Sequence, residues 1–232
     1  MTDLHTHILP GMDDGAVDVQ QSLVMLKREE EQGVKTVALT PHYYPRRESI
    51  ESFLQRREHA FRRMQNHIAA SSVQDTLPAL CLGAEVAYVP GMWERQELPG
   101  LCYDGTSVLL VELPFSPWND EIFQELHRIL SRRGITPMIA HLERYIRIQK
   151  PQHMRRLLEM EIPYQVSASA MMRPFSRGPR KLWLAGGVPV SDCHDDRQRV
   201  PNLGNLKSFI CCKYGKEATD AFIAQTDILN QM

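Results

Sequence analysis

The chain begins Met1-Thr-Asp-Leu-His5-Thr-His7-Ile-Leu-Pro10-Gly-Met-Asp13-Asp14-Gly15. A short strand over residues 2–6 would place the imidazoles of His5 and His7 side by side at its carboxyl end. The acidic pair Asp13–Asp14 follows closely enough to close on the same point. Imidazole nitrogen and carboxylate oxygen together are typical ligands of Zn²⁺, Mn²⁺ and Fe²⁺. The alternative is that His5 and His7 are two surface histidines followed by a simple turn. The rest of the chain must decide between this alternative and a metal site.

Length and composition favour one cytoplasmic α/β domain over residues 1–232. The apolar share is 43%, and 27 basic against 28 acidic residues leave a net charge of -1. This charge balance argues against a general nucleic-acid binder. No apolar run approaches the roughly 18 residues of a membrane span, which argues against membrane insertion. Five cysteines without Cys-x-x-Cys spacing indicate reduced thiols.

Apolar stretches that resemble strands alternate with helical patterns along the whole chain. One helix is predicted from Asp18 to Gly33, because Asp18 and Gln21 have capping-box spacing. A second, over about 49–70, has apolar residues at three- and four-residue intervals. The segment 171–180 is irregular and is predicted as a loop. The seven predicted strands are 2–6, 35–41, 78–86, 107–113, 135–140, 162–167 and 188–192.

Apolar strands that alternate with helices imply a parallel sheet covered on both faces. Either an open doubly wound sheet or a closed barrel would satisfy this pattern. No Gly-x-Gly-x-x-Gly follows the first strand, and no Gly-x-x-x-x-Gly-Lys is present. Nucleotide binding by either of these loops is therefore not predicted.

Metal-binding residue types stand at the carboxyl end of almost every predicted strand. The carboxyl ends of a parallel barrel meet at one mouth, where these residues would share a pocket. Taken one at a time, an acidic residue of this set could be a solvated strand end, and a histidine could be a hydrogen-bonded core residue. Unrelated surface residues, however, would scatter over both ends of the strands. Beyond the first strand, the segments are Thr40-Pro41-His42, Gly83-Ala84-Glu85, Val111-Glu112-Leu113-Pro114, Ala140-His141-Leu142-Glu143-Arg144 and Ser191-Asp192-Cys193-His194.

Nine candidate ligands exceed the three or four that one catalytic zinc takes from protein. Two or three metals with bridging carboxylates would use them all, and metals about 3.5–4 Å apart are typical of phosphate-ester hydrolysis. Arg144, Arg197 and Arg199 follow the fifth and seventh strands, where they could clamp a phosphoryl group. The candidate ligands are His5, His7, one aspartate of the pair Asp13–Asp14, His42, Glu85, Glu112, His141, Asp192 and His194.

One competing motif is Cys193-His-Asp-Asp-Arg-Gln-Arg199, which has the Cys-x-x-x-x-x-Arg spacing of cysteine-dependent tyrosine phosphatases. That loop cradles phosphate with backbone N–H groups and needs an electropositive setting to keep its thiol ionised. Here Asp195 and Asp196 lie inside the loop and would repel the substrate. A cysteine nucleophile is therefore not predicted.

The motifs resemble, in order, those of the polymerase-and-histidinol-phosphatase (PHP) superfamily, from residue 3 to about residue 199. More narrowly, they resemble its CpsB/CapC branch of metal-dependent bacterial protein-tyrosine phosphatases. The most specific motif is the opening Asp3-Leu-His-Thr-His-Ile-Leu-Pro-Gly-Met-Asp-Asp-Gly15. Leu142 stands where the family commonly has proline, and Cys193 where it has a small residue. The other matching motifs are Thr40-Pro-His42, Gly83-Ala-Glu85, Val111-Glu-Leu-Pro114, Ala140-His-Leu-Glu-Arg-Tyr145 and Ser191-Asp-Cys-His194.

The resemblance implies a distorted (β/α)7 TIM-like barrel, the PHP fold, with a trinuclear centre that usually uses manganese. Iron or zinc would suit the same ligands. It selects Asp14 rather than Asp13, and it places the two phosphate-binding arginines at Arg144 and Arg199. The implied ligands are His5, His7, Asp14, His42, Glu85, Glu112, His141, Asp192 and His194.

The resemblance also implies a reaction and a partner. The substrate would be phosphotyrosine on the tail of a bacterial tyrosine kinase that controls capsule or exopolysaccharide synthesis. The predicted reaction is in-line attack on phosphorus by a metal-bridging hydroxide. A phosphatase of a small molecule such as histidinol phosphate, and a non-catalytic regulatory PHP domain, are the alternatives. The basic residues at 46–63 could dock an acidic peptide, although a solvated helix face is the simpler account.

Overall fold

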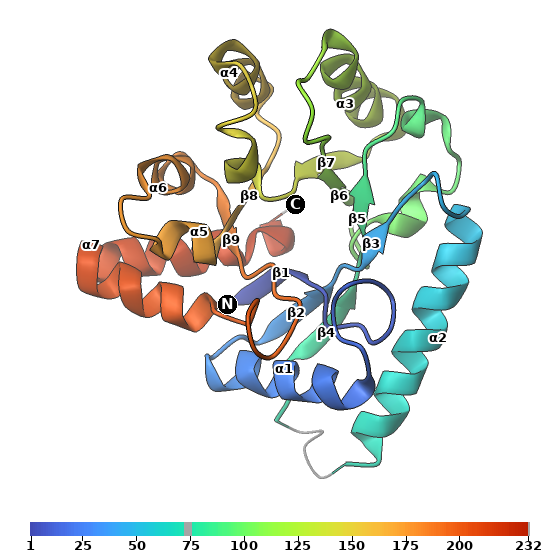
Figure 1. The fold of residues 1–232 in the computed structure, drawn as a ribbon, viewed down its shortest axis with the longest axis vertical. Helices are drawn as coiled ribbons and strands as arrows, with labels where there is room; N and C mark the ends of the chain where they lie inside the picture. Colours follow the sequence, from blue (N-terminus) through green and yellow to red (C-terminus); the bar gives the residue numbers. More distant parts are fainter. Residues whose placement is uncertain (72–75, 232) are drawn as a thin grey trace.

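The computed structural model describes residues 1–71 and 76–231. Its strands lie in the middle of the molecule and its long helices surround them (Figure 1). The strands are β1 (Thr2–Thr6), β2 (Thr36–Leu39), β3 (His42–Tyr43), β4 (Ala79–Leu82), β5 (Glu85–Ala87), β6 (Val108–Glu112), β7 (Thr136–Ile139), β8 (Gln165–Ser167) and β9 (Val188–Val190). The helices are α1 (Val19–Glu31), α2 (Ile50–Ala69), α3 (Asp120–Arg133), α4 (Pro151–Glu159), α5 (Ala168–Met172), α6 (Arg177–Leu184) and α7 (Leu203–Thr226). The mixed α/β class predicted from the sequence is confirmed.

All pairings between the strands are parallel, and they form three sheets. Their orders are β1-β2-β4, β3-β5-β6-β7 and β8-β9. Single bridges link Thr6 to Cys193 and Ile139 to Tyr164. The described residues thus show no continuous closed barrel sheet of the kind predicted. The order of the strands nevertheless brings the end of β9 beside β1.

Two of the predicted strands are each divided into two. The stretch 35–41 ends as β2 at Leu39, and β3 starts after Pro41, which has no N–H to donate to a ladder. The stretch 78–86 divides at Gly83, where an added Cβ would lie 3.0 Å from the Tyr103 ring. The two breaks lie at matching positions in the neighbouring strands β2 and β4. The continuations of these strands, β3 and β5, therefore pair with each other in the second sheet. This shift places His42 opposite Glu85.

The first two helices begin at the residues that the sequence predicts. The Asp18 carboxylate caps α1 by accepting a hydrogen bond from the Gln21 N–H at 2.9 Å. Ser49 caps α2 by accepting from the Ser52 N–H. The prediction of a loop over segment 171–180 is wrong for most of its residues. The end of α5 and the start of α6 occupy most of it, and only residues 173–176 lie outside these helices.

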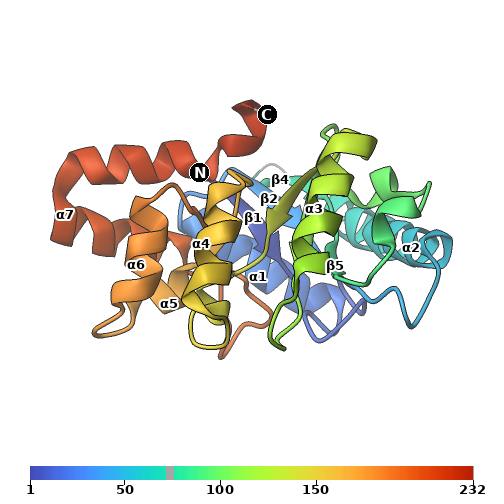
Figure 2. The same cartoon turned by 90° about the horizontal axis from the view of Figure 1, so that it is seen from above.

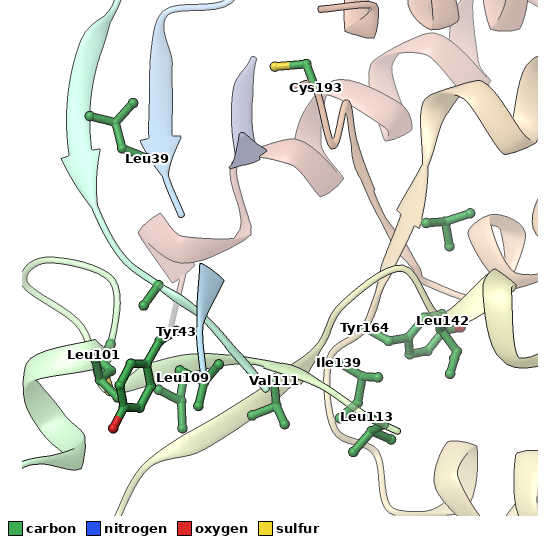
Figure 3. Close-up of a cluster of buried hydrophobic side chains, with 14 of the residues drawn as sticks. Leu39, Tyr43, Leu101, Leu109, Val111, Leu113, Ile139, Leu142, Tyr164 and Cys193 are labelled. Carbon is green, nitrogen blue, oxygen red and sulfur yellow. The ribbon is translucent and has the colours of Figure 1, made fainter. Parts of the chain in front are cut away.

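Both faces of the central strands are buried. In β6, Leu109 and Val111 belong to the core that packs against the helices, while Val108 and Leu110 face an inner cluster. This alternation is expected of a strand covered on both sides. Figure 3 shows part of the outer core, including Leu109, Val111 and Ile139.

The carboxyl-terminal helix α7 packs against β9 and β1. Its backbone leaves the helical region at Gly215, where φ is 84° and ψ is -174°. The chain reverses there, so that α7 consists of two limbs (Figure 2). A membrane-spanning helix would need a longer apolar run than any helix of the described residues provides.

Candidate metal centre

The nine predicted ligands meet at the carboxyl ends of the strands. Most of them are buried; the exceptions are His42 and Glu112, which are partly exposed, and Asp14, whose side chain is 65% exposed. Buried imidazoles and carboxylates at this density must be paired or must bind a cation. The residues that the structure brings together are His5, His7, Asp14, His42, Glu85, Glu112, His141, Asp192 and His194.

Three adjoining groups within this set could each hold one ion. Within a group, the ligand atoms all lie within 4.8 Å of one another. His7 belongs to the first two groups and His42 to the first and third, so the three groups form one continuous centre. The groups are His7, Asp14, His42 and His194; then His5, His7 and Asp192; then His42, Glu85 and Glu112.

Glu85 is the central carboxylate. Its Oε2 lies 3.2 Å from His5 Nε2, 3.3 Å from His7 Nε2 and 3.0 Å from His42 Nδ1. Its Oε1 lies 2.8 Å from His141 Nε2. One carboxylate that reaches four imidazoles is suited to bridge two ions.

Backbone pairing sets these distances. In the β3–β5 ladder, His42 is the direct partner of Glu85. On the other side, the His7 N–H donates to the Cys193 carbonyl at 2.9 Å, and the Asp192 N–H donates to the His5 carbonyl at 3.0 Å. These bonds hold the chain that follows β9 against the end of β1. Ligands from the two ends of the sequence therefore become neighbours.

The loop after β1 folds back tightly on His7. The Ala16 N–H donates to the His7 carbonyl at 2.9 Å, and an added Cβ on Gly15 would lie only 2.1 Å from that oxygen. Only glycine fits this close approach. The loop presents Asp14, whose Oδ1 lies 3.6 Å from the Nε2 atoms of both His42 and His194.

Asp13 differs from Asp14, because its carboxylate already accepts hydrogen bonds from within the protein. Its Oδ2 accepts hydrogen bonds from His7 Nδ1 at 2.7 Å and from the His42 N–H at 2.8 Å. Its Oδ1 accepts from the Gly15 N–H at 2.9 Å. The geometry thus supports the choice of Asp14 over Asp13 as a ligand, and it makes Asp13 a residue that orients His7.

Three of the histidines have their tautomer set by an oxygen acceptor. His5 Nδ1 donates to Gln165 Oε1 at 2.8 Å, and His194 Nδ1 donates to the Asp192 carbonyl at 3.1 Å; His7 Nδ1 donates to Asp13. Each Nδ1 therefore carries a proton, so that each ring, once neutral, presents its Nε2 lone pair to the centre. This is the arrangement expected of metal-binding histidines.

The spacing of the ring nitrogens also fits a divalent cation. His5 Nε2 and His7 Nε2 lie 3.1 Å apart, which is hydrogen-bond distance when one of the two rings is protonated. Two imidazoles bound to one ion at about 2.0–2.1 Å each would have a similar separation. In addition, His194 Nε2 and His141 Nδ1 are buried without a hydrogen-bond partner. The donor set therefore suits divalent ions.

Two of the predicted ligands have unusual backbone angles. His141 has a φ of 31° and Asp192 a φ of 54°. Residues other than glycine in this region cost about 1–3 kcal/mol each and concentrate at functional sites. Here they turn the chain immediately after β7 and β9, so that both side chains point into the centre.

Charge around the centre changes the pKa of several groups. Burial lowers the pKa of His7, but Asp13 and Glu85 outweigh it and raise that pKa to about 10. Burial likewise opposes the charged form of His141, but Glu112 and Glu85 raise its pKa to about 9. In the metal-free protein, both imidazoles are therefore protonated at neutral pH. The carboxylates around the centre thus favour positive charge there, on protonated imidazoles in the metal-free protein.

Metal loading is expected to release protons at pH 7, because His7, His42 and His141, whose pKa values are all raised, must be neutral to bind. The apparent Mn²⁺ affinity should therefore weaken as the pH falls. In the metal-free protein, the same raised pKa values add stability below pH 6.5 that is lost as the pH rises towards 9 and 10. Calorimetric titration with Mn²⁺ in two buffers of different ionisation enthalpy measures the release. Asp13→Asn should lower it by about one proton, and equal heats in both buffers would contradict the prediction.

Two arginines bind the same carboxylate beside the centre. Arg144 and Arg199 each form an ion pair between Nη2 and Asp192 Oδ2. For Arg199 the distance between these atoms is 2.9 Å. Their side chains are 35% and 40% exposed, so an anion can reach them. The Arg197 side chain, in contrast, is 87% exposed, and its Nε lies 4.0 Å from Asp196 Oδ1. The two arginines implied by the resemblance are thus the two that lie at the centre.

Cys193 has no access to substrate. It is fully buried, and its Sγ lies 3.9 Å from Glu29 Oε1. Burial, together with the nearby carboxylates of Glu29 and Asp3, raises the pKa of its thiol well above the usual value. A thiol that stays protonated is a poor nucleophile.

Cys193→Ser is therefore expected to retain phosphatase activity to within about threefold, because no step needs this thiol. The measurement is kcat for p-nitrophenyl phosphate in metal-loaded protein. A loss of several orders of magnitude with normal metal content would instead indicate a cysteine nucleophile.

Sequence reasoning missed two residues that orient the ligands. Gln165 is fully buried, and its Nε2 donates to Tyr103 Oη at 3.2 Å while its Oε1 accepts from His5. The other is Asp3, whose Oδ1 accepts from the N–H groups of His5 at 3.2 Å and Ser191 at 3.1 Å. Neither residue was marked by a pattern in the sequence, because β1 and β8 each contain other polar residues as well.

Comparisons with known proteins agree with this geometry. A family model described as capsular polysaccharide synthesis, CpsB/CapC, matches residues 1–228. The tyrosine-protein phosphatase CpsB of Streptococcus pneumoniae is 29% identical over 245 residues, covering 96% of this chain and 95% of that protein. The tyrosine-protein phosphatase YwqE of Bacillus subtilis (strain 168) is 27% identical over 183 residues, covering 76% of this chain and 68% of that protein.

A solved structure shares the fold. It comes from work described as crystal structures of YwqE from Bacillus subtilis and CpsB from Streptococcus pneumoniae, unique metal-dependent tyrosine phosphatases. The TM-score is 0.82 at 22% sequence identity, and the match covers 100% of this chain and 94% of the other.

Proposed function

This chain belongs to the CpsB/CapC family, and from that premise we propose that it is a metal-dependent protein-tyrosine phosphatase. The observation that carries the proposal is the continuous centre of imidazoles and carboxylates around Glu85, with Arg144 and Arg199 at its edge. Hydrolysis of a phosphate monoester needs the ligand cluster and the arginines, because cations must bind the phosphoryl oxygens and a metal must activate water.

In this proposal the nine residues hold two or three divalent ions, with manganese as the expected metal. The ligands are His5, His7, Asp14, His42, Glu85, Glu112, His141, Asp192 and His194. Bound ions would supply an activated water and would neutralise charge on the phosphoryl group. Asp13 and Gln165 hold the rings of His7 and His5 in the tautomer that ligation needs.

Arg144 and Arg199 act on the substrate itself. Their guanidinium groups bind the phosphoryl oxygens and stabilise the charge that spreads over them in the transition state. Both groups are already oriented by the Asp192 carboxylate. The tyrosine phenolate, with a pKa near 10, leaves more easily than an aliphatic alkoxide.

The three sheets would act as one distorted (β/α)7 barrel over residues 1–232. Two observations support this proposal. The bridges Ile139–Tyr164 and Thr6–Cys193 connect neighbouring sheets around a ring. The inner apolar cluster also draws residues from strands of all three sheets, among them Leu4, Leu110 and Val190. A barrel would explain why ligands from both ends of the chain share one mouth.

The proposed substrate is a tyrosine-phosphorylated protein of capsule synthesis, specifically the phosphotyrosine tail of a bacterial tyrosine kinase in the cytoplasm. The test combines metal analysis of the purified protein with rates on a phosphotyrosine peptide and on histidinol phosphate. We expect bound divalent metal, loss of turnover with a chelator, recovery with Mn²⁺, and preference for the peptide. A metal-free protein without turnover, or a preference for histidinol phosphate, would overturn the assignment.

A further inference from the structure

A cavity of about 640 Å³ adjoins the metal centre. Its volume is within the range of small-molecule pockets, about 300–1,000 Å³. Arg144, Asp192 and Arg199 form the wall that it shares with the centre, and α5, α6 and the turn between them form the opposite side. A substrate whose phosphoryl group contacts Arg144 and Arg199 would therefore have its neighbouring groups in this cavity.

Three further arginines line the cavity: Arg147, Arg173 and Arg177. All three are exposed, and within residues 1–71 and 76–231 none of them has a carboxylate partner. The carboxylates in the wall are Glu143, which is buried and accepts a hydrogen bond from the Ser167 N–H, and Asp192, which is bound by two arginines. The open part of the cavity is thus strongly positive.

A buried hydroxyl faces this positive region without a partner. Ser167 is only 2% exposed, and its Oγ has no hydrogen-bond partner in the structure. Buried polar atoms are usually satisfied within the protein, so the Ser167 hydroxyl keeps a donor that the protein does not use. A hydroxyl can donate to an anion, as the arginines can.

The turn between α5 and α6 is fixed by other contacts. Arg180 donates to the carbonyls of Met171 and Arg173, each at 2.9 Å. Phe175 lies at the tip of this turn with a φ of 58° and is 94% exposed. A large apolar residue in this backbone region is an outlier that adds nothing to the core. Its free ring at the rim of the cavity is suited to stack on an aromatic ligand.

We propose that this cavity is a subsite for a second anionic group of the substrate, bound by Arg147, Arg173, Arg177 and the Ser167 hydroxyl. The inference rests on the proposed function and specifies its substrate class. The preferred substrate is a peptide in which the phosphotyrosine has a negatively charged neighbour, either a second phosphotyrosine or an acidic side chain. Phe175 packs on an aromatic ring of that neighbour when it is phosphotyrosine.

The experiment compares three peptides of equal length with metal-loaded protein. One has a single phosphotyrosine among neutral residues, one has a second phosphotyrosine, and one has glutamate at the second position. We expect kcat/KM to rise about tenfold with either second charge, chiefly through KM, with the larger rise for phosphotyrosine. This preference should weaken as the salt concentration rises.

Arg173→Ala and Arg177→Ala should each reduce the ratio of kcat/KM between charged and neutral peptides by about threefold to fivefold. The matched control is Arg155→Ala, an exposed arginine of α4 that does not line the cavity and should leave the ratio unchanged. Ser167→Ala should reduce the ratio for the second phosphotyrosine. A ratio near one in the wild type, or ratios that the variants leave at the wild-type value, would overturn the subsite. Absence of turnover on all three peptides would instead overturn the proposed function.

Discussion

Glu85→Gln is expected to lower kcat for p-nitrophenyl phosphate by about 10³-fold or more and to remove bound metal. Glu85 lies within 3.3 Å of four imidazoles, so its loss affects more of the centre than that of a peripheral ligand. Glutamine keeps the size of the side chain but cannot bridge two cations with two negative oxygens. The measurements are metal content by elemental analysis and kcat at saturating Mn²⁺.

Glu125→Gln is the matched control, because Glu125 is equally buried at 1% exposed but lies on α3, where it accepts a hydrogen bond from the Trp93 N–H. It should keep the metal content and most of the activity. Far-ultraviolet circular dichroism of both variants separates loss of metal from loss of fold. A Glu85→Gln protein that retains full metal and turnover would show that the centre is not organised around this carboxylate.

Much of the fold followed from local patterns in the sequence. The capped starts of α1 and α2 depend on residues within one helical turn, and the apolar strands depend on residues adjacent in sequence. What local patterns could not show is the division of the strands at Pro41 and Gly83, because that break depends on pairing with β5 and on contact with Tyr103. The separation of the strands into three sheets was likewise not readable, since it depends on register between distant segments.

The candidate ligands were predictable because their residue types recur at one kind of position, the carboxyl end of a strand. The residues that orient them were not, because Asp13 and Gln165 act through hydrogen bonds that only the folded chain reveals. The arginines that line the cavity beside the metal centre were missed for a similar reason. Arg173 and Arg177 lie in the segment predicted as an irregular loop, where no periodic pattern indicates which side chains share a surface.

Arg199→Ala is expected to lower kcat/KM for a phosphotyrosine peptide by about 10²–10³-fold with metal content unchanged. Its guanidinium lies at the centre, 2.9 Å from Asp192, and would contact phosphoryl oxygens whose charge changes in the transition state. The decrease should therefore appear in kcat as well as in KM. Arg144→Ala should behave alike, and the double variant should lose less than the product of the two single effects, because both groups share Asp192 Oδ2.

The matched control for this prediction lies two residues away in the same loop. Arg197→Ala removes the same charge, but the Arg197 side chain is 87% exposed and its Nε lies 4.0 Å from Asp196 Oδ1. A contact of that kind is worth little, so its kcat/KM should stay within about twofold of the wild type. If both variants lost activity equally, the arginines would act through the general positive potential of the loop. If only Arg199→Ala lost it, the effect would come from direct contact with the phosphoryl group, which is the outcome that the geometry around Asp192 requires.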